Sequence, residues 1–540
     1  MKPFATVLEV GTSLNNHTGS WRTERPSYAH RLPPCNNACP AGENIQEWLS
    51  LAEQEKYEEA WREIVKNNPF PAIMGRVCYH PCENACNRVT IESPVGINSV
   101  ERFLGDKAIR DKWAFDRPAA KSGKKVLVIG AGPAGLSAAY HLARLGHKVT
   151  VKESLKKAGG MLRYGIPQYR LPRKILDAEI KRIVDYGVEL ELNKKVTNLA
   201  EVVESKAFDA VFLSIGAHIA KLTEFPTSPR SRVLDAVAVL RDMENREKPK
   251  LGKRVVVYGG GNTAMDVART AKRLGAKEVT IVYRRTREKM PAHSFEIDEA
   301  LQEGIKIKFL VTIKKYQNKK LTLGKMALDA KGYPQPTGKN ETMETDCIVL
   351  ALGQDSDLAL LEKFPGLEIA DGALKVDSRM MTSHAGVFAG GDMIPSERTA
   401  TTGIGHGKKA ARSIDAWLRK VEQPATEKHS LATAERLNKW YYAEAPENKR
   451  KLIDIAHRTK TFDEVQLGLS EAEALNEARR CLSCGNCFEC DNCYGVCPDN
   501  AIRKLGAGKG FKIDYDYCKG CGLCAAECPC GCIEMTPEDI

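Results

Sequence analysis

The sequence has no apolar run that approaches the ~20 residues needed for a membrane-spanning helix. Its beginning, Met1 to Thr6, lacks the charged and then apolar segments of a secretory signal. Lysine and arginine (81) outnumber aspartate and glutamate (69), but they are spread along the chain without a nucleic-acid-binding motif. We therefore expect a cytoplasmic protein that neither spans a membrane nor binds nucleic acid. We interpret its charge of +12 as a solvated surface, biased toward an acidic partner or an anionic cofactor.

Cysteine is scarce in the middle of the chain, whereas twelve of the 18 cysteines follow residue 480. In a reducing compartment, cysteines ligate metals or carry redox chemistry rather than form structural disulfides. Two runs have the spacing Cys-x2-Cys-x2-Cys-x3-Cys-Pro, which is typical of a domain with two 4Fe–4S clusters. The first run is Cys487, Cys490, Cys493 and Cys497, and the second is Cys518, Cys521, Cys524 and Cys528.

Each cluster of such a domain takes three thiolates from one run and the fourth from the other. The expected sets are Cys487, Cys490, Cys493 and Cys528 for one cluster, and Cys518, Cys521, Cys524 and Cys497 for the other. The alternatives are a zinc site or a disulfide-bonded knot, but zinc seldom uses two such runs that each end in Cys-Pro. The end of the chain is thus predicted to move electrons one at a time.

A glycine-rich turn between a strand pattern (residues 125–129) and a helix pattern (136–145) predicts a dinucleotide site. The turn contains Gly130, Gly132, Pro133, Ala134 and Gly135. Glycines at this place let backbone N–H groups approach a pyrophosphate. The next strand ends at Glu153, where a carboxylate binds a ribose hydroxyl. A glycine turn without a ligand is the alternative.

A segment near residue 390 indicates which dinucleotide binds there. Gly391 and Asp392 follow a short strand pattern, and Thr402 lies at the start of a helix pattern. In flavoproteins such an aspartate binds the ribityl chain, and the N-terminus of such a helix favours the anionic reduced flavin. We therefore predict FAD at the first site, and we interpret His406 as a surface or capping histidine.

A second strand–glycine–helix unit begins at residue 254, and its turn contains Gly259, Gly261, Asn262 and Thr263. The following strand ends in Arg284 and Arg285. A carboxylate at this place would favour NAD, whereas arginines accommodate the 2′-phosphate of NADP. The sequence therefore favours NADP(H) over NAD(H). The alternative is that the two arginines only form a solvated basic turn.

A chain of 540 residues is too long for one core, so we expect several domains. The predicted fold class is multidomain, with an α-helical iron–sulfur domain, two α/β dinucleotide-binding (Rossmann-like) domains and an α+β two-cluster ferredoxin domain. The predicted boundaries are 1–122 for the helical domain, 123–250 with 375–420 for a discontinuous FAD domain, 251–374 for the NADP domain, 421–480 for a helical linker and 481–540 for the ferredoxin domain.

Several short segments occur together in one known family. They are Arg76-Val77-Cys78 with Cys82 and Cys86, the turn at 130–135, Gly159 to Pro167 with Tyr169 to Pro172, Tyr283 to Arg285 with Met290 to Ala292, and Ala351 to Gln354. Through them the chain resembles the small (β) subunit of bacterial glutamate synthase, a module shared with dihydropyrimidine dehydrogenase and NADH-dependent ferredoxin:NADP oxidoreductase. With its ferredoxin tail, the chain looks like the flavoprotein subunit of a 2-oxoacid:acceptor oxidoreductase complex.

The resemblance implies further site residues. It adds to the cofactor-binding residues Gly160, Met161, Arg170, Gly216 and Gly353. It also implies an N-terminal 4Fe–4S cluster whose ligands are Cys39, Cys78, Cys82 and Glu101. Without the resemblance, we would interpret Glu101 as a surface glutamate on a helix. Three clusters are therefore expected in the whole chain.

The chain departs from this family at a second N-terminal cluster. Where the family has a Cys-x2-Cys pair, this chain has Ser27 and His30. Only Cys35 and Cys86 remain for that cluster, and two ligands do not hold a cube.

A surplus pair, Cys481 and Cys484, lies in the phrase EARRCLSCG, which looks like the missing pair moved to the other end of the chain. Together with the two N-terminal cysteines, it permits a fourth cluster. The alternatives are that the pair is spare, or that it shares zinc or another cluster with Cys530 and Cys532.

A pyridine nucleotide delivers two electrons together, an iron–sulfur cluster accepts one, and a flavin connects them. The chain contains a predicted site for each, so we expect an FAD-dependent NAD(P)H:acceptor oxidoreductase subunit of a hetero-oligomer. Electrons would pass between NADP(H), FAD, clusters and a ferredoxin or catalytic partner subunit. The alternatives are a glutamate synthase small subunit that feeds a large FMN subunit, and an electron-transfer module with a vestigial nicotinamide site. We assign no acid–base catalytic residue.

Overall fold

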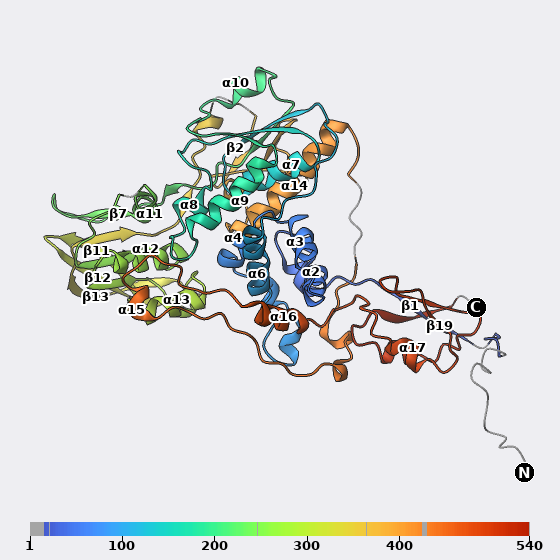
Figure 1. The fold of residues 1–540 in the computed structure, drawn as a ribbon. Coiled ribbons are helices and arrows are strands. Elements are labelled where there is room, and N and C mark those ends of the chain that lie inside the picture. The colour runs from blue at the N-terminus through green and yellow to red at the C-terminus, as the bar shows by residue number, and fades with distance from the viewer. Residues whose placement is uncertain are drawn as a thin grey trace, which may run out of the picture.

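A computed structural model of the chain describes residues 16–20, 22–245, 247–362, 364, 366–423 and 429–538, so Met1 to Thr6 lie outside the described residues. Figure 1 shows two α/β regions, a group of helices from the N-terminal part, and a C-terminal region that lies on the far side of these helices from the second α/β region. Among the described residues, no helix is long and apolar enough to cross a membrane.

The first α/β region contains a parallel sheet with the strand order β18-β5-β2-β3-β4. Its strands are β2 (Lys125–Ile129), β3 (Lys148–Lys152), β4 (Glu189–Glu191), β5 (Ala210–Leu213) and β18 (Val387–Ala389). Its helices are α7 (Pro133–Arg144), α8 (Met161–Tyr164), α9 (Arg173–Asp185), α10 (Leu199–Glu204) and α14 (Ala400–Arg419). Because β18 pairs with β5, two separate segments of the chain build this region.

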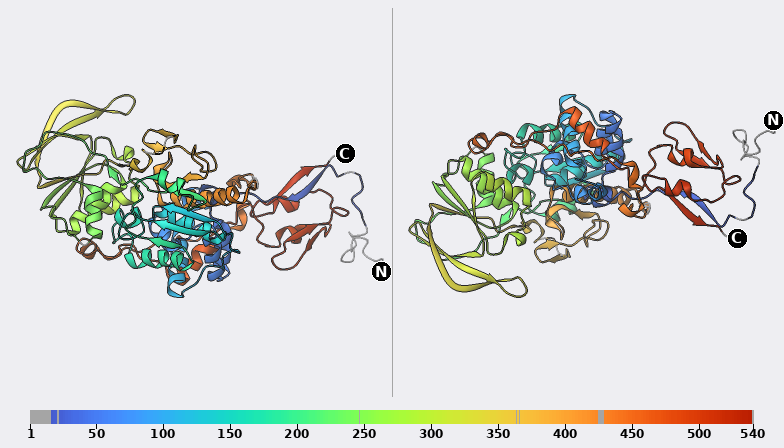
Figure 2. Two further views of the ribbon diagram at one scale, coloured as in Figure 1. Left: turned by 90° about the horizontal axis from the view of Figure 1, so that it is seen from above. Right: turned by 90° about the horizontal axis from the view of Figure 1, so that it is seen from below.

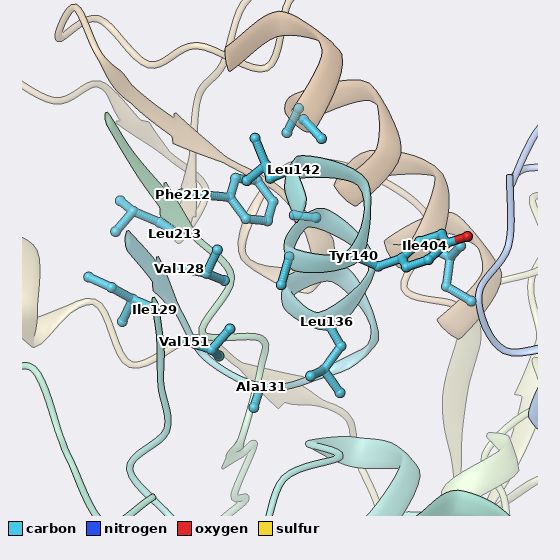
Figure 3. Packing of buried hydrophobic residues seen from close by; sticks show 14 of the residues in the cluster. Val128, Ile129, Ala131, Leu136, Tyr140, Leu142, Val151, Phe212, Leu213 and Ile404 are labelled. Carbon is cyan, nitrogen blue, oxygen red and sulfur yellow. The ribbon is translucent and has the colours of Figure 1, made fainter. Parts of the chain in front are cut away.

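The core of this region lies between the sheet and the helices on its faces. Val128 on β2 and Phe212 on β5 pack with Leu136 and Leu142 on α7 (Figure 3). Continuous apolar strands are expected where both faces of a parallel sheet are covered, and each such side chain contributes about 1.5–3 kcal/mol by burial. A side chain at Gly407 would collide with the backbone of α7, so this glycine lets α14 pack closely on α7. The close packing brings the N-terminus of α14 beside the glycine turn.

The second α/β region contains a parallel sheet with the strand order β10-β9-β8-β14-β7. Its strands are β7 (Val233–Asp235), β8 (Arg254–Tyr258), β9 (Glu278–Val282), β10 (Lys306–Lys308) and β14 (Cys347–Leu350). Its helices are α11 (Ala236–Glu244), α12 (Asn262–Arg273) and α13 (Ser294–Gln302). An antiparallel sheet joins it, with β11 (Val311–Gln317), β12 (Lys320–Leu328) and β13 (Pro334–Glu344). Between the two regions, β6 (Ile219–Ala220) pairs with β15 (Gln354–Asp355).

The border between the two regions differs from the boundaries predicted at 250 and 374. Strand β7, which we expected in the FAD domain, pairs with β14 in the second sheet. Leu360 and Leu374, which we expected in the NADP domain, belong to the core of the first region. Strands β16 (Ile369–Ala370) and β17 (Ala373–Leu374) lie in this returning segment. The glycine turn marks where the second dinucleotide unit begins, but it carries no sign of an edge strand that precedes it.

The N-terminal helices pack around Trp48, Leu104 and neighbouring apolar side chains. They are α1 (Pro34–Ala38), α2 (Ile45–Glu53), α3 (Tyr57–Val65), α4 (Pro71–Val77), α5 (Pro81–Asn84) and α6 (Ile97–Arg110). Helix α16 (Glu471–Arg479), from the far end of the chain, contributes Ala474 and Ala478 to the same core. The helical domain is therefore completed by residues near the C-terminus.

The prediction of a helical linker over 421–480 is wrong for most of its length. Its described helices are α15 (Ile455–Arg458), α16 and the 3-10 turns Ala434–Arg436 and Lys439–Tyr441. The rest is held by polar contacts with the helical domain. Arg76 Nε donates to Glu464 Oε1 over 2.7 Å, and Arg102 Nη1 donates to the Gln466 carbonyl over 2.8 Å. These long-range contacts leave no periodic pattern in the sequence.

The C-terminal region contains α17 (Asn492–Val496), α18 (Leu523–Ala526), β19 (Ile502–Lys504), β20 (Phe511–Ile513) and β21 (Ile533–Pro537). Strand β1 (Glu24–Tyr28) pairs antiparallel with β21, so an N-terminal strand joins this region (Figure 2). Ser27 lies opposite Glu534 in this pairing. The predicted 1–122 domain is therefore divided, because its first strand completes the sheet of the ferredoxin-like region.

Candidate functional site

A cavity of about 640 Å³ lies at the carboxyl ends of strands of the first sheet, where open α/β sheets bind dinucleotides. The predicted site residues that line it are Gly130, Gly132, Pro133, Ala134, Glu153, Gly160, Met161, Gly216, Gly391 and Asp392. They come from the turn before α7, the end of β3, the start of α8, the end of β5 and the turn before α14. The structure thus brings together most of the predicted FAD set.

The glycine turn leaves room that a ligand would fill. Gly130 has a φ of +103°, and a Cβ there would lie 2.5 Å from the Ser214 carbonyl oxygen. A side chain at Gly135 would collide with the Gly130 carbonyl, so this glycine permits close packing of helix on strand. At Gly132, in contrast, an added Cβ would meet only Gly160 Cα, at 3.9 Å. This open space before the N-terminus of α7 fits a pyrophosphate.

Two of the predicted site residues that line this cavity are carboxylates. Glu153 Oε2 accepts from the Ala131 N–H over 2.8 Å, and Oε1 accepts from the Leu155 N–H over 2.9 Å. These bonds fix the carboxylate at the end of β3, where a ribose is expected. Burial raises the pKa of Asp392, although Arg398 opposes the rise. The position of Glu153 fits the adenosine end of FAD, and the position of Asp392 fits its ribityl chain.

Four predicted residues do not line the cavity. Gly135 packs against its own turn, and Thr402 donates its N–H to Thr399 Oγ1 over 3.1 Å at the start of α14. The Gly353 carbonyl accepts from the Lys221 N–H over 2.9 Å. Arg170 is the clearest departure. Its guanidinium lies 2.8 Å from Asp266 Oδ2 and 2.6 Å from Glu296 Oε1, so it connects the two α/β regions.

The second dinucleotide site is formed between β8 and α12. A side chain at Gly259 would collide with the Ala351 carbonyl, whereas the space around Gly261 is open. Arg284 is exposed just after β9, beside this turn. Arg285 Nε is buried without a hydrogen-bond partner among the described residues. An open helix N-terminus next to the end of the strand that precedes two arginines fits a phosphorylated dinucleotide.

The polar side chains at the start of α12 hold neighbouring segments. Asn262 Oδ1 accepts from the His293 N–H over 3.0 Å, and Thr263 Oγ1 accepts from Gln354 Nε2 over 3.4 Å. The imidazole of His293 stacks on Tyr79 with ring centroids 3.7 Å apart. Tyr79 also lines the FAD cavity, so it lies between the two sites. Sequence analysis missed Tyr79, although it adjoins the predicted ligand Cys78.

The N-terminal ligand set predicted from the resemblance comes together. A small cavity is lined by Cys39, Cys78, Cys82 and Glu101. Glu101 is only 6% exposed, which excludes its interpretation as a surface glutamate. Burial raises its pKa well above the usual value, as do the nearby carboxylates Glu43 and Glu179. Three thiols beside a deeply buried carboxylate fit an iron–sulfur cluster, whose iron atoms would offset the cost of burying this charge.

The C-terminal region arranges its cysteines in the crossed sets expected from the two runs. One small cavity is lined by Cys497, Cys518, Cys521 and Cys524. In the other set, burial raises the pKa of Cys493, as do its neighbours Cys487, Cys490 and Cys528. Cys528 Sγ also lies 3.7 Å from Cys530 Sγ and 3.6 Å from Cys532 Sγ. Soft thiolates in two groups of four fit two 4Fe–4S clusters.

These sites define an iron–sulfur flavoprotein oxidoreductase that uses a pyridine nucleotide. The chain belongs to the pyridine nucleotide-disulphide oxidoreductase family, whose model matches residues 124–412. A model of dihydropyrimidine dehydrogenase domain II with its 4Fe–4S cluster matches residues 9–113, and a 4Fe–4S dicluster domain matches residues 486–532.

Three relatives extend over most of the chain. It is 36% identical over 498 residues to subunit beta of the NADP(+)-dependent formate dehydrogenase of Moorella thermoacetica, which covers 84% of this chain and 70% of that protein. It is 31% identical over 520 residues to subunit beta of the NADPH-Fe(3+) oxidoreductase of Geobacter sulfurreducens, with coverages of 85% and 77%. It is 33% identical over 418 residues to the small chain of the NADPH glutamate synthase of Escherichia coli, with coverages of 72% and 89%.

These findings confirm the predicted relationship to the glutamate synthase small subunit and the predicted fold class. They also confirm FAD, NADP(H) and 4Fe–4S clusters as the cofactors of an oxidoreductase. The individual ligands of each cofactor stay predictions.

Proposed function

We propose that this chain is the NADP(H)-linked flavoprotein subunit of an oxidoreductase complex. Electrons pass between NADP(H) at the second α/β region, FAD at the first, and 4Fe–4S clusters that serve a catalytic partner subunit or a ferredoxin. The main support is the contact between the flavin cavity and the N-terminal cysteine cavity. Val77 and Ala400 line the first, whereas the next residues, Cys78 and Thr401, line the second.

The chain's own residues have separate tasks in this function. Arg284 and Arg285 bind the 2′-phosphate of the nucleotide, and Tyr79 packs between the two dinucleotide sites. The N-terminus of α14 favours negative charge beside the flavin cavity. FAD supplies the change from two-electron to one-electron transfer. The cysteines of the N-terminal and C-terminal cavities would hold clusters that carry single electrons, so no proton-transferring side chain would be needed beyond the flavin.

The nature of the partner is a finer proposal. We propose a catalytic subunit of the 2-oxoacid oxidoreductase type, in the cytoplasm, because the ferredoxin-like region gives the chain an outlet for single electrons. None of the 18 cysteines forms a disulfide bond, which supports a reducing compartment. The relatives named beta subunits also support work within a complex.

Dye reduction by the purified full chain tests the proposed function. We expect NADPH to reduce a one-electron acceptor of higher potential, such as ferricyanide, and we expect the Arg284→Gln/Arg285→Gln variant to lose most of this activity at low NADPH concentration. A chain with bound FAD that does not react with NADPH would instead be an electron carrier with a vestigial nicotinamide site. Purification from its host under anaerobic conditions would identify the partner. A co-purifying glutamate synthase large subunit would favour the alternative function.

A further inference from the structure

A third small cavity lined by cysteines lies between the helical domain and the ferredoxin-like region. Its cysteines are Cys35, Cys86, Cys481 and Cys484. The first two follow the start of α1 and the end of α5, and the last two follow α16. We propose that these four thiolates hold a fourth 4Fe–4S cluster, whose ligand set is completed by a cysteine pair from the far end of the chain.

A buried network of charges holds the C-terminal pair in place. Glu477 is fully buried, and its Oε2 accepts from the Gly96 N–H over 2.7 Å. Arg480, which directly precedes the pair, donates from Nη1 to the Pro94 carbonyl over 2.8 Å and from Nη2 to the Ser93 carbonyl over 2.7 Å. Buried charges are costly unless they are paired and hydrogen-bonded. This satisfied network therefore fixes the position of Cys481 against the N-terminal helices.

Contacts from the N-terminal side complete the anchor. Arg88 Nη1 donates to the Arg480 carbonyl over 2.6 Å. Asn87 Nδ2 lies 3.4 Å from Cys484 Sγ and donates to it. Hydrogen bonds to cluster sulfur atoms stabilise the more negative, reduced state. The segment after Cys86 thus holds the far pair and also supplies a polar contact to one of the proposed ligands.

The spacing of the thiols favours a cluster over a zinc ion. Tetrahedral zinc with bonds of about 2.3 Å brings its thiolates to about 3.8 Å from one another. In the part of the chain that the structure describes, the one group of three such ligands within 4.8 Å is Cys528, Cys530 and Cys532. No three of the four thiols of this cavity therefore lie within 4.8 Å of one another, which favours a cube over a single zinc ion. The surrounding side chains are mostly apolar and include Leu49 and Val95.

The cavity also has neighbours on both sides that contain cysteines. Ile97 lines both this cavity and that of Cys39, Cys78, Cys82 and Glu101. On the other side, the Gly485 N–H donates to the Cys530 carbonyl over 2.7 Å. Tyr442 Oη donates to the Leu482 carbonyl, also over 2.7 Å. The fourth cluster thus lies between the cluster beside the flavin and the ferredoxin-like pair.

This position gives the fourth cluster a role in electron transfer. It accepts one electron from the cluster beside the flavin, which is oxidised by one electron, and it reduces a ferredoxin-like cluster by the same amount. The role rests on the proposed function, whereas the ligand set does not.

Iron content and native mass of the full chain, reconstituted anaerobically with iron and sulfide, test the ligand set. Four cubes give ~16 iron per wild-type chain, and three give ~12. We expect the wild type to have the higher value, and the Cys481→Ala/Cys484→Ala variant to lose ~4 iron while it keeps its FAD. The matched control is Cys347→Ala, because Cys347 is buried in the second α/β region, and it should retain the wild-type iron content.

Several results would overturn the proposal. A wild-type chain with ~12 iron would exclude the fourth cluster, and this measurement does not depend on the folding of any variant. Unchanged iron in the double variant would exclude the ligand set. A zinc atom that disappears with Cys481 and Cys484 would replace the cluster by a zinc site. Reduction by dithionite counts the clusters without NADPH, so failure of the proposed nicotinamide reaction would be visible separately.

Discussion

Thr401 Oγ1 donates a hydrogen bond to Cys78 Sγ over 3.1 Å. This bond joins the first turn of α14, whose neighbouring residues line the flavin cavity, to a cysteine of the N-terminal cavity. The two residues are 323 positions apart in the sequence. The contact therefore depends on the second segment of the FAD region returning to the first sheet.

Replacing Thr401 should change the potential of the N-terminal cluster. A donor to a thiolate stabilises the reduced, more negative cluster, so Thr401→Val should lower its reduction potential. A hydrogen bond of about 1 kcal/mol corresponds to about 40 mV for one electron. Redox titration followed by EPR measures the shift, and Thr401→Ser should restore the wild-type value. An equal potential in wild type and Thr401→Val would show that the hydroxyl does not act on this cluster.

Glu101 should be the fourth ligand of the same cluster. Glu101→Ala should give a labile or three-iron cluster, whereas Glu101→Cys should keep a cube with an altered potential. Glu43 is a second carboxylate of the same cavity that is not in the predicted ligand set, so Glu43→Gln is the matched control and should keep a four-iron cluster. EPR spectra and iron content check these outcomes. If both Glu101 variants match the wild type, Glu101 is not a ligand.

Arg284 and Arg285 should determine the preference for NADPH. Each charge-assisted hydrogen bond to the 2′-phosphate contributes about 1.5–3 kcal/mol, or roughly a factor of 10 to 100. The variant with both arginines replaced by glutamine should therefore lose most of its preference in kcat/KM for flavin reduction. Arg287→Gln is the control, because Arg287 is exposed on the same turn and pairs with Asp298. Faster flavin reduction by NADH than by NADPH in the wild type would contradict the assignment.

The buried group of Arg170, Asp266 and Glu296 should make stability depend on pH. Burial raises the pKa of Glu296 to about 7, although Arg170 opposes the rise. A carboxyl whose pKa is higher in the folded state is most favourable below its unfolded pKa of about 4.5, and its contribution falls as pH rises to about 7.

The contribution of Glu296 to the free energy of unfolding should fall by an amount on the order of 3 kcal/mol, and this fall should be complete above pH ~7. Glu296→Gln imitates the protonated state, so its apparent Tm should fall less than that of the wild type between pH 5 and 8. In a chain of this size, each kcal/mol of stability corresponds to a change in Tm of about 4 °C or less. Asp298→Asn, at an exposed position of the same helix, is the control. Parallel pH profiles for wild type and Glu296→Gln would contradict this account.

Sequence patterns predicted the parts that depend on local chemistry. The glycine turns require backbone conformations and close approaches that few other residues permit, so Gly130 and Gly259 were recognisable without a structure. The regular cysteine runs were recognisable in the same way, because their spacing alone is typical of 4Fe–4S ligands. Arg170 was misplaced because its motif marks a loop typical of the family but not the direction of its side chain, which turns toward Asp266.

Other features depend on contacts between distant segments. The pairing of β1 with β21 joins residues near both ends of the chain, and no local pattern signals it. Likewise, the EARRCLSCG phrase identifies a cysteine pair, but only the buried network of Glu477 and Arg480 shows where that pair lies. The prediction of a helical linker failed for the same reason, because ion pairs with the N-terminal helices hold this segment in place.

In the proposed function, the nicotinamide site, FAD and the clusters form one path for electrons. The most direct measurement starts from the full chain with its clusters reduced by dithionite, the excess reagent being removed, and adds NADP+ anaerobically. We expect the EPR signals of the reduced clusters to disappear as NADPH forms, with two electrons lost from flavin and clusters for each NADPH. Clusters that stay reduced, with no NADPH formed although FAD is bound, would contradict the account.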